Sequence, residues 1–236
     1  MNIVKHIPNT ITCLNLFSGC VSCVMAFEEQ YFLAALFVFL AAVFDFCDGM
    51  AARLLKAYSD IGKELDSLAD VISFGFAPGM VIFSWLNQIG NCEYLSYIAF
   101  LIPIFSALRL AKFNVDERQT SSFIGLPTPA NAIFMVSMIA MMDPSVPVPG
   151  WVDMSWFSSI VGNMWVIIAL VILFSYLLVC ELPMFSLKFK NLSWKDNKAQ
   201  FILIGISLLL LSLFQLLAFP FIILTFIVMS IILKGR

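Results

Sequence analysis

The chain has 236 residues, of which 61% are hydrophobic and 12% are charged. Soluble domains contain about 25% charged residues, so this composition excludes an ordinary soluble protein and indicates a polytopic membrane protein. The net charge of −2 and the absence of a long basic run in the sequence argue against nucleic-acid binding.

Eight apolar stretches are long enough to be transmembrane helices, because about 20 apolar residues cross the hydrocarbon core. In chain order they cover residues 11–27, 31–52, 66–86, 94–112, 126–142, 160–180, 200–216 and 218–234. Only the region around Pro220 separates the last two, and we expect them to form a tight helical hairpin. The predicted fold is an all-α membrane bundle of about eight helices, organised as a single domain over residues 1–236.

The basic residues are segregated with respect to these spans. All 13 Lys and Arg residues fall at the termini or in alternate connections, whereas the connections around Glu28, Glu93 and residues 143–153 contain acids and no bases. The positive-inside rule therefore predicts a multi-pass protein of the cell membrane with both termini cytoplasmic. The basic stretch 188–198 is expected to bind anionic lipid headgroups.

Four aspartates lie where the second and third predicted spans reach the cytoplasmic side. Asp45 and Asp48 are three residues apart, and Asp66 and Asp70 are four apart, so each pair occupies one helix face. A carboxylate within a membrane costs about 2.5–3.5 kcal/mol at a helix centre, which calls for a compensating partner. Because oxygen ligands suit Mg²⁺ or Mn²⁺, we expect a metal site where the two pairs meet.

The residues beside this cluster suit phosphoryl chemistry. Gly49 and Ala52 leave room for a large group, and the Arg53 guanidinium is a fork that matches a phosphate. A cation, a phosphate clamp and a spare carboxylate base favour metal-assisted phosphoryl transfer. A divalent-cation transporter is the alternative of another class, although no polar trail continues through the later spans.

The pattern D-x2-D-G-x2-A-R-x8-G-x3-D-x3-D from Asp45 to Asp70 resembles the signature of the CDP-alcohol phosphatidyltransferases. These integral membrane enzymes displace CMP from a CDP-linked lipid with an alcohol. The resemblance implies that Asp45, Asp48 and Asp66 hold Mg²⁺ or Mn²⁺. Asp70 would take the alcohol proton and also touch metal. The residues implied to bind CDP-diacylglycerol are Asn9, Thr12, Gly49, Ala52, Arg53 and Ser59. For Asn9 and Thr12 the alternative is capping of the first helix.

Three further segments bear on the acceptor alcohol: residues 7–19, residues 73–78, and residues 108–114 followed by 123–129. Together they resemble the membrane-type phosphatidylserine synthases of bacteria and archaea within that family. The resemblance implies transfer of the phosphatidyl group from CDP-diacylglycerol to L-serine by direct displacement, giving phosphatidylserine and CMP. We also expect a homodimer with its active site facing the cytoplasm.

Serine is a zwitterion and needs a cation for its carboxylate and an acceptor for its ammonium group. Arg109 and Lys112 are candidates for the first role, and Asn114 is a candidate for the second. The alternative for the two cations is positive-inside anchoring. Another alcohol, such as glycerol 3-phosphate, would also need cations, so these residues alone do not select serine.

Overall fold

The computed structural model describes residues 6–90, 93–116, 123–185, 193–194 and 196–233. Within these residues almost every regular element is a helix, which confirms the predicted helical class. The exception is a short antiparallel pairing of β1 (Phe123–Ile124) with β2 (Pro183–Met184). Several basic positions used in the topology argument lie outside the described residues: Lys5, Arg118, Lys188, Lys190, Lys195, Lys234 and Arg236.

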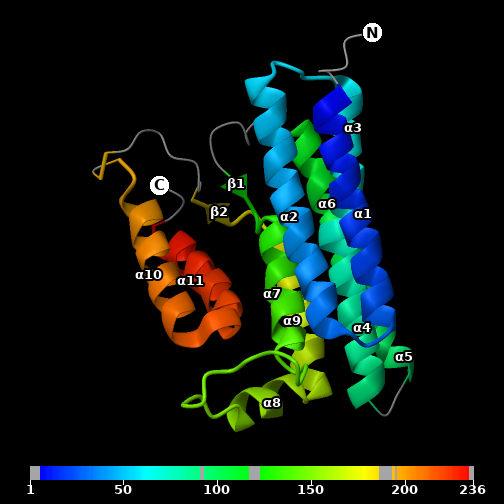
Figure 1. The fold of residues 1–236 in the computed structure, drawn as a ribbon, viewed down its shortest axis with the longest axis vertical. Coiled ribbons are helices and arrows are strands. Elements are labelled where there is room, and N and C mark those ends of the chain that lie inside the picture. Colours follow the sequence, from blue (N-terminus) through cyan, green and yellow to red (C-terminus); the bar gives the residue numbers. More distant parts are fainter. Residues whose placement is uncertain (1–5, 91–92, 117–122, 186–192, 195, 234–236) are drawn as a thin grey trace.

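The first two helices form a long antiparallel pair (Figure 1). Helix α1 (Ile7–Phe27) carries Pro8 in its first turn, where the missing amide hydrogen costs no helical hydrogen bond. Helix α2 (Tyr31–Leu54) follows after a short connection. Small buried residues on α2 let the two backbones approach, and Ser22 Oγ donates a hydrogen bond to the Ala34 carbonyl at 2.8 Å.

The next three elements form one continuous apolar helix over Asp60–Ile89. It starts as α3 (Asp60–Asp70), becomes the π-helix η2 (Val71–Phe76) and continues as α4 (Ala77–Ile89). Ser59 caps α3, because its Oγ accepts a hydrogen bond from the Gly62 amide at 3.0 Å. The π-helical turn therefore begins at the residue that follows Asp70.

The remaining helices complete the bundle. Short α5 (Glu93–Ser96) and η3 (Tyr97–Phe100) lead into α6 (Leu101–Val115), which is followed by α7 (Thr128–Ala140). Helices α8 (Ser155–Val161) and α9 (Met164–Val179) meet at a bend of 69°. The last elements are α10 (Lys198–Phe214), η5 (Gln215–Leu217) and α11 (Ala218–Leu233).

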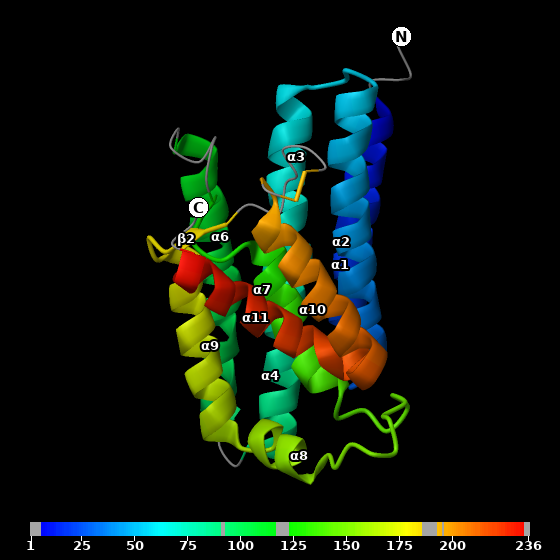
Figure 2. The ribbon, with the colours of Figure 1, turned by 90° about the vertical axis from the view of Figure 1, so that its left-hand side faces the viewer.

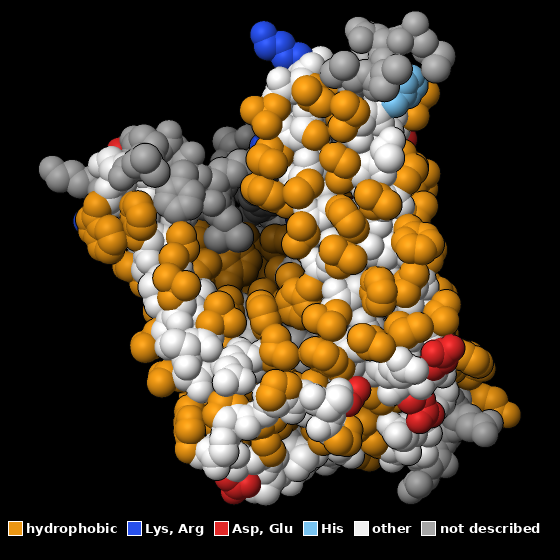
Figure 3. All heavy atoms as spheres, in the orientation of Figure 1, with side chains coloured by type: hydrophobic (Ala, Val, Ile, Leu, Met, Phe, Trp, Pro, Cys, Tyr) orange, Lys and Arg blue, Asp and Glu red, His pale blue; other side chains and the backbone are white. Residues whose placement is uncertain are grey.

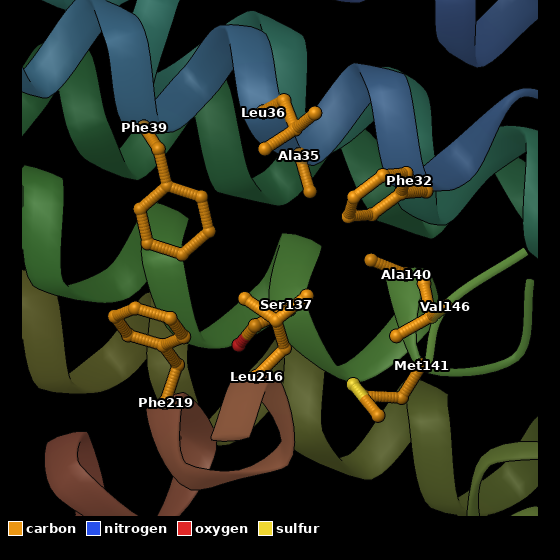
Figure 4. Close-up of a pocket in the computed structure, with 10 residues that line it drawn as sticks. All are labelled: Phe32, Ala35, Leu36, Phe39, Ser137, Ala140, Met141, Val146, Leu216 and Phe219. Atoms are coloured by element: carbon orange, nitrogen blue, oxygen red, sulfur yellow. The ribbon is translucent and has the colours of Figure 1, made fainter. Parts of the chain in front are cut away.

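Helices α10 and α11 pack against each other as the predicted hairpin and lie across one side of the bundle (Figures 1 and 2). The chain reverses at Gln215, which has a φ of 50°. Where the hairpin meets α2 and α7, the Phe39 and Phe219 rings lie 4.5 Å apart beside an apolar pocket (Figure 4). Apart from Ser137, the side chains that line this pocket in the described chain are apolar.

The structure supports fewer independent spans than the sequence predicts. In the described part of the chain, five helices are long and apolar enough to cross a membrane, or six when α8 and α9 count as one bent span. Helix α7 falls short of the predicted 126–142, because prolines 127 and 129 flank its start and a turn begins at Met141. The count of eight spans remains a prediction.

Charge is distributed unevenly along the bundle. In Figure 3 the Lys and Arg side chains visible on this face lie in the upper half, at the end where α2 terminates. The connection that contains Glu28 and Glu29 lies at the opposite end, where α2 begins. The last turns of α2 and the first turns of α3, which carry Asp45, Asp48 and Asp66, therefore lie toward the basic end of the bundle.

Candidate metal centre

Three carboxylates converge where α2 and α3 lie side by side. Asp45, Asp48 and Asp66 each offer one oxygen atom, and these atoms all lie within 4.8 Å of one another. Asp48 is buried and the other two are partly buried. Like charges this close repel one another strongly away from bulk water, and a divalent cation would compensate them. The predicted convergence of these residues is therefore present in the structure.

Two side chains of helix α1 donate hydrogen bonds to the aspartates. Thr12 Oγ1 donates a hydrogen bond to Asp48 Oδ2 at 2.6 Å, and Asn15 Nδ2 donates one to Asp70 Oδ1 at 3.3 Å. Thr12 and Asn15 are three residues apart, so both point from one face of α1 toward the carboxylates. Asp70 itself lies outside the group of three close oxygens and is held by Asn15 instead.

An open pocket adjoins Asp48 and Asp66 and contains about 590 Å³ of space not filled by atoms, part of it open to solvent. Five of the six residues predicted to bind the CDP lipid line it: Asn9, Thr12, Gly49, Ala52 and Ser59. Arg53 is not among its lining residues and is exposed in the last turn of α2. Lys63 lines the pocket and adds a cation that the sequence analysis did not identify.

Two glycines shape this pocket in different ways. A Cβ atom at Gly62 would lie 2.9 Å from both Asn9 Oδ1 and Ser59 Oγ, so glycine allows the starts of α1 and α3 to meet. A Cβ atom at Gly49 would meet nothing within 4 Å, because Gly49 faces open space. Helix α1 begins at Ile7, so neither Asn9 nor Thr12 is its N-cap residue. Their placement is explained by the pocket rather than by capping.

A second pocket lies on the α6 side of the aspartates and contains about 840 Å³ of space not filled by atoms. Arg109 and Lys112 line it together with Asp116 and Glu181. Arg109 is only 6% exposed and interacts electrostatically with Asp70. Its guanidinium also lies 5.6 Å from the centre of the Phe113 ring. This pocket therefore contains charges of both signs, and one of them, Arg109, lies within reach of the charge of Asp70.

The segment before α7 fixes Arg109 in this position. Arg109 Nε donates a hydrogen bond to the Leu126 carbonyl at 2.7 Å, and the Leu126 amide donates to the Leu177 carbonyl at 2.9 Å. Gly125 has a φ of 78°, and a Cβ atom there would lie 2.6 Å from the Leu178 carbonyl oxygen. The Gly-Leu-Pro segment singled out in the sequence thus connects Arg109 to the end of α9.

Asn114 has a different environment from Arg109 and Lys112. It does not line the second pocket, and its Nδ2 donates a hydrogen bond to Ser67 Oγ at 2.9 Å. Ser67 follows Asp66 on α3, so this bond ties the end of α6 to the helix that carries Asp66 and Asp70. The contact gives Asn114 a role in packing the site together.

A sequence model of the CDP-alcohol phosphatidyltransferase family matches residues 5–173. This range includes the four aspartates and the helices α1, α2, α3 and α6 that surround them. The chain belongs to this family. As a family member it is a transferase of phospholipid biosynthesis and a membrane protein, which excludes the cation-transporter alternative as its class. The match ends within α9 and does not include the α10–α11 hairpin.

Three relatives named CDP-diacylglycerol–serine O-phosphatidyltransferase illustrate the similarity. The Bacillus subtilis protein is 36% identical over 157 residues, which cover 65% of this chain and 86% of that protein. The Mycobacterium leprae protein is 32% identical over 161 residues, covering 65% of this chain and 52% of the relative. The Helicobacter pylori protein (strain 26695) is 35% identical over 147 residues, covering 60% of each. The chain thus spans little more than half the length of the last two.

The donor set of this phosphatidyltransferase fits a metal ion. Asp66 Oδ1 is buried and has no hydrogen-bond partner in the described structure, as expected of an oxygen that is available to a cation. Thr12 occupies one oxygen of Asp48 and leaves the other free to face its neighbours. The three carboxylates can therefore hold a metal ion.

Two supporting residues were not given roles from the sequence. Asn15 was noted only as part of a motif, although a polar residue three positions after Thr12 in an apolar helix is a usable signal. Lys63 lies between Gly62 and Asp66 in sequence, but whether its side chain faces the pocket depends on the position of the first turn of α3. Both assignments required the packing of α1 against α3.

Proposed function

We propose that this enzyme transfers the phosphatidyl group of CDP-diacylglycerol to L-serine and releases phosphatidylserine and CMP. The observation that carries the proposal is the position of the aspartates between two pockets. Asp48 and Asp66 border the pocket beside Gly49, whereas Asp70 is next to Arg109, which borders the other. The names of the relatives support serine as the acceptor.

In this proposal Asp45, Asp48 and Asp66 hold Mg²⁺ or Mn²⁺, with Asp70 as a further ligand. The bound cation would neutralise the diphosphate and stabilise the charge that develops during transfer. The role of Thr12 is to orient Asp48 through the hydrogen bond of 2.6 Å. Hydrogen-bonded metal ligands keep their geometry when substrate arrives, which limits the reorganisation needed for reaction.

The open pocket beside Gly49 receives the CDP group of the lipid. Gly49 and Ala52 leave the space, Asn9, Thr12 and Ser59 provide polar contacts, and Lys63 adds a positive charge near the diphosphate. Arg53 is adjacent to Ala52 in sequence and reaches this pocket only when its exposed side chain turns toward it. We therefore assign Arg53 a contact with CDP that forms on substrate binding.

Asp70 is the proposed general base. It takes the proton of the serine hydroxyl, and the serine oxygen forms a bond to the β-phosphorus while the bond from that phosphorus to the CMP oxygen breaks. Asn15 engages Asp70 Oδ1, which leaves Oδ2 for the proton. A positioned general base typically contributes about 10²–10⁴-fold to the rate.

The acceptor pocket suits a zwitterion. Arg109 and Lys112 would bind the serine carboxylate, and the acids of the same pocket, Asp116 and Glu181, would favour its ammonium group. A phosphorylated alcohol such as glycerol 3-phosphate would meet the same cations but would be repelled by the two acids. We therefore place glycerol 3-phosphate second. Asn114 keeps its proposed role: its Nδ2 is bonded to Ser67, and its Oδ1 would accept a hydrogen bond from the ammonium group.

We further propose that the whole chain is one domain in the cell membrane, with the aspartates and both termini facing the cytoplasm, and that it acts as a homodimer. The upper-half location of the visible basic side chains in Figure 3 supports this orientation. The acids at the other end of α2 are consistent with a non-cytoplasmic position.

The test is an alcohol panel with purified protein in detergent. CMP release is measured with CDP-diacylglycerol and L-serine, D-serine, glycerol 3-phosphate or inositol phosphate, each with Mg²⁺, with Mn²⁺ and with a chelator. The proposal expects release that requires L-serine, the lipid and a divalent cation. Faster release with glycerol 3-phosphate than with serine would contradict it.

A further inference from the structure

The π-helix η2 links the two groups that the proposed function uses on the acceptor. It starts immediately after Asp70 and packs against both α1 and α6, the helix that carries Arg109. π-helical turns are rare and occur frequently at functional sites. We propose that η2 is a positioning device, clamped at Ser73 and Gly75, that sets the distance between Asp70 and Arg109. This inference rests on the proposed function.

The first contact of the clamp is with α1. A Cβ atom at Gly19 would collide with Ser73 Oγ and would lie 2.7 Å from Ser73 Cα, so only glycine permits this approach. Ser73 Oγ donates a hydrogen bond to the Asn15 carbonyl at 3.0 Å. Asn15 also donates from its side chain to Asp70, so a single residue of α1 holds η2 and the carboxylate that precedes it.

The second contact is with α6. A Cβ atom at Gly75 would lie 3.1 Å from Ser106 Cβ and 3.2 Å from Pro103 Cα, so a side chain there would require α6 to move by a few tenths of an ångström. Ser73 and Gly75 are two positions apart, which points them to roughly opposite sides of the helix. Residues 73–75 are all buried, as expected for a segment packed between α1 and α6.

This contact lies next to Arg109 in the bundle. Ser106 precedes Arg109 by nearly one helical turn, so both are on the same side of α6. The helix containing η2 and helix α6 run in opposite directions (Figure 1), so moving back from Gly75 and forward from Ser106 leads to Asp70 and Arg109. The separation at Gly75 therefore determines how far Arg109 stands from Asp70.

An alanine at position 75 is expected to move α6 by a few tenths of an ångström, because neither Pro103 Cα nor Ser106 Cβ can rotate away. A misplacement of about 1 Å can cost roughly 10²-fold in rate. This smaller shift weakens the contact of Arg109 with the serine carboxylate, so it should raise the serine KM by about tenfold. The effect should fall on serine, which contacts Arg109 and Asp70, and not on the CDP lipid, whose pocket lies on the other side of the aspartates.

The experiment compares Gly75→Ala with Gly79→Ala in detergent-purified protein. Gly79 contacts Pro103 too, since a Cβ atom there would lie 3.0 Å from Pro103 Cδ, but it is one turn further from Asp70. We expect Gly75→Ala to raise the KM for serine about tenfold and to leave the KM for CDP-diacylglycerol within about twofold. Gly79→Ala should lower the thermal midpoint comparably while the serine KM stays near that of wild type.

A double variant provides a rescue. Ser106→Gly removes the Cβ atom that the new alanine would meet, and it breaks no hydrogen bond because Ser106 Oγ is buried without a partner in the described structure. Because Pro103 Cα would still lie 3.2 Å from the new Cβ atom, Gly75→Ala combined with Ser106→Gly should recover part of the loss in the serine KM. If Gly75→Ala does not fold, Ser73→Ala removes the bond to Asn15 without a steric clash and should lower kcat for serine in a folded protein.

The outcomes separate the claims. An unchanged serine KM in Gly75→Ala, an equal rise in Gly79→Ala, or no rescue by Ser106→Gly would overturn the positioning role. If Ser73→Ala is used instead, a folded variant with the kcat of wild type would also overturn the positioning role. Absence of serine-dependent CMP release in wild type would instead overturn the proposed function, and the glycine variants would then be compared with the alcohol that wild type uses.

Discussion

Asn15 donates a hydrogen bond to Asp70 across 55 residues of sequence, at 3.3 Å. Asn15 is fully buried in α1, and Asp70 is buried at the end of α3. The bond joins a helix that lines the donor pocket to the proposed base of the acceptor pocket. In the proposed mechanism this bond gives α1 a part in orienting the base, which its apolar composition does not suggest.

Replacing this amide should lower turnover without unfolding the protein. A hydrogen bond to a charged group contributes about 1.5–3 kcal/mol, so Asn15→Leu should lower kcat roughly tenfold to a hundredfold. Ser22→Ala is the control, since Ser22 lies on the same helix and its Oγ donates to the Ala34 carbonyl, away from the carboxylates. CMP release with serine measures both variants. Wild-type kcat in folded Asn15→Leu would show that Asn15 does not orient Asp70.

Removing a proposed metal ligand should abolish turnover. In Asp66→Asn one charged oxygen donor of the three-carboxylate group is lost, while the buried amide keeps nearly the same volume. We expect no measurable CMP release and a weaker affinity for Mn²⁺ in a binding titration, with the thermal midpoint largely retained. Substantial CMP release at saturating Mg²⁺ would be incompatible with Asp66 as a ligand.

Asp70 should behave as a base rather than only as a ligand. If it only held metal, added Mn²⁺ should partly rescue Asp70→Asn; if it takes the serine proton, rescue should fail. The loss should be at least about 10²-fold, while affinity for CDP-diacylglycerol survives. The measurement pairs lipid affinity with CMP release across a Mn²⁺ titration. Activity that climbs toward wild type would assign the base elsewhere.

Much of this site was predictable because its chemistry follows helical periodicity. The spacing of Asp45, Asp48 and Asp66 placed their side chains on facing helix surfaces, and the structure brings them together. The reverse turn before α11 was also predicted, because an apolar run of that length is too long for one crossing. In both cases a local sequence feature, residue spacing or the length of an apolar run, agrees with the packing found in the structure.

The remaining features depend on tertiary contacts. Residues 71–76 form a π-helix that lies between the close approaches at Gly19 and Gly75, and no local sequence pattern records these approaches. The sequence placed Arg53 in the donor pocket, but its position in the last turn of α2 leaves it exposed. Asn114 is predicted to contact serine, and the structure adds a hydrogen bond from its Nδ2 to Ser67 of the neighbouring helix, which the sequence did not indicate.

Orientation in the membrane can be measured with single cysteines. In a chain whose six cysteines are replaced by alanine, we expect Ser145→Cys to react with an impermeant maleimide from outside intact cells. Asp60→Cys should react only after the cells are opened. Both positions are exposed: Ser145 lies in the connection between α7 and α8, and Asp60 is the first residue of α3, at the opposite end of the bundle. Labelling of both from the same side would rule out the proposed arrangement.

The most direct test of the central claim follows the serine carbon atoms into lipid. Wild-type protein is incubated with CDP-diacylglycerol, Mg²⁺ or Mn²⁺ and isotopically labelled L-serine, and both the lipid fraction and CMP are quantified. The account predicts labelled phosphatidylserine and CMP in equal amounts, with neither formed by Asp66→Asn. CMP release without label in the lipid, or label only in the presence of a different alcohol, would contradict it.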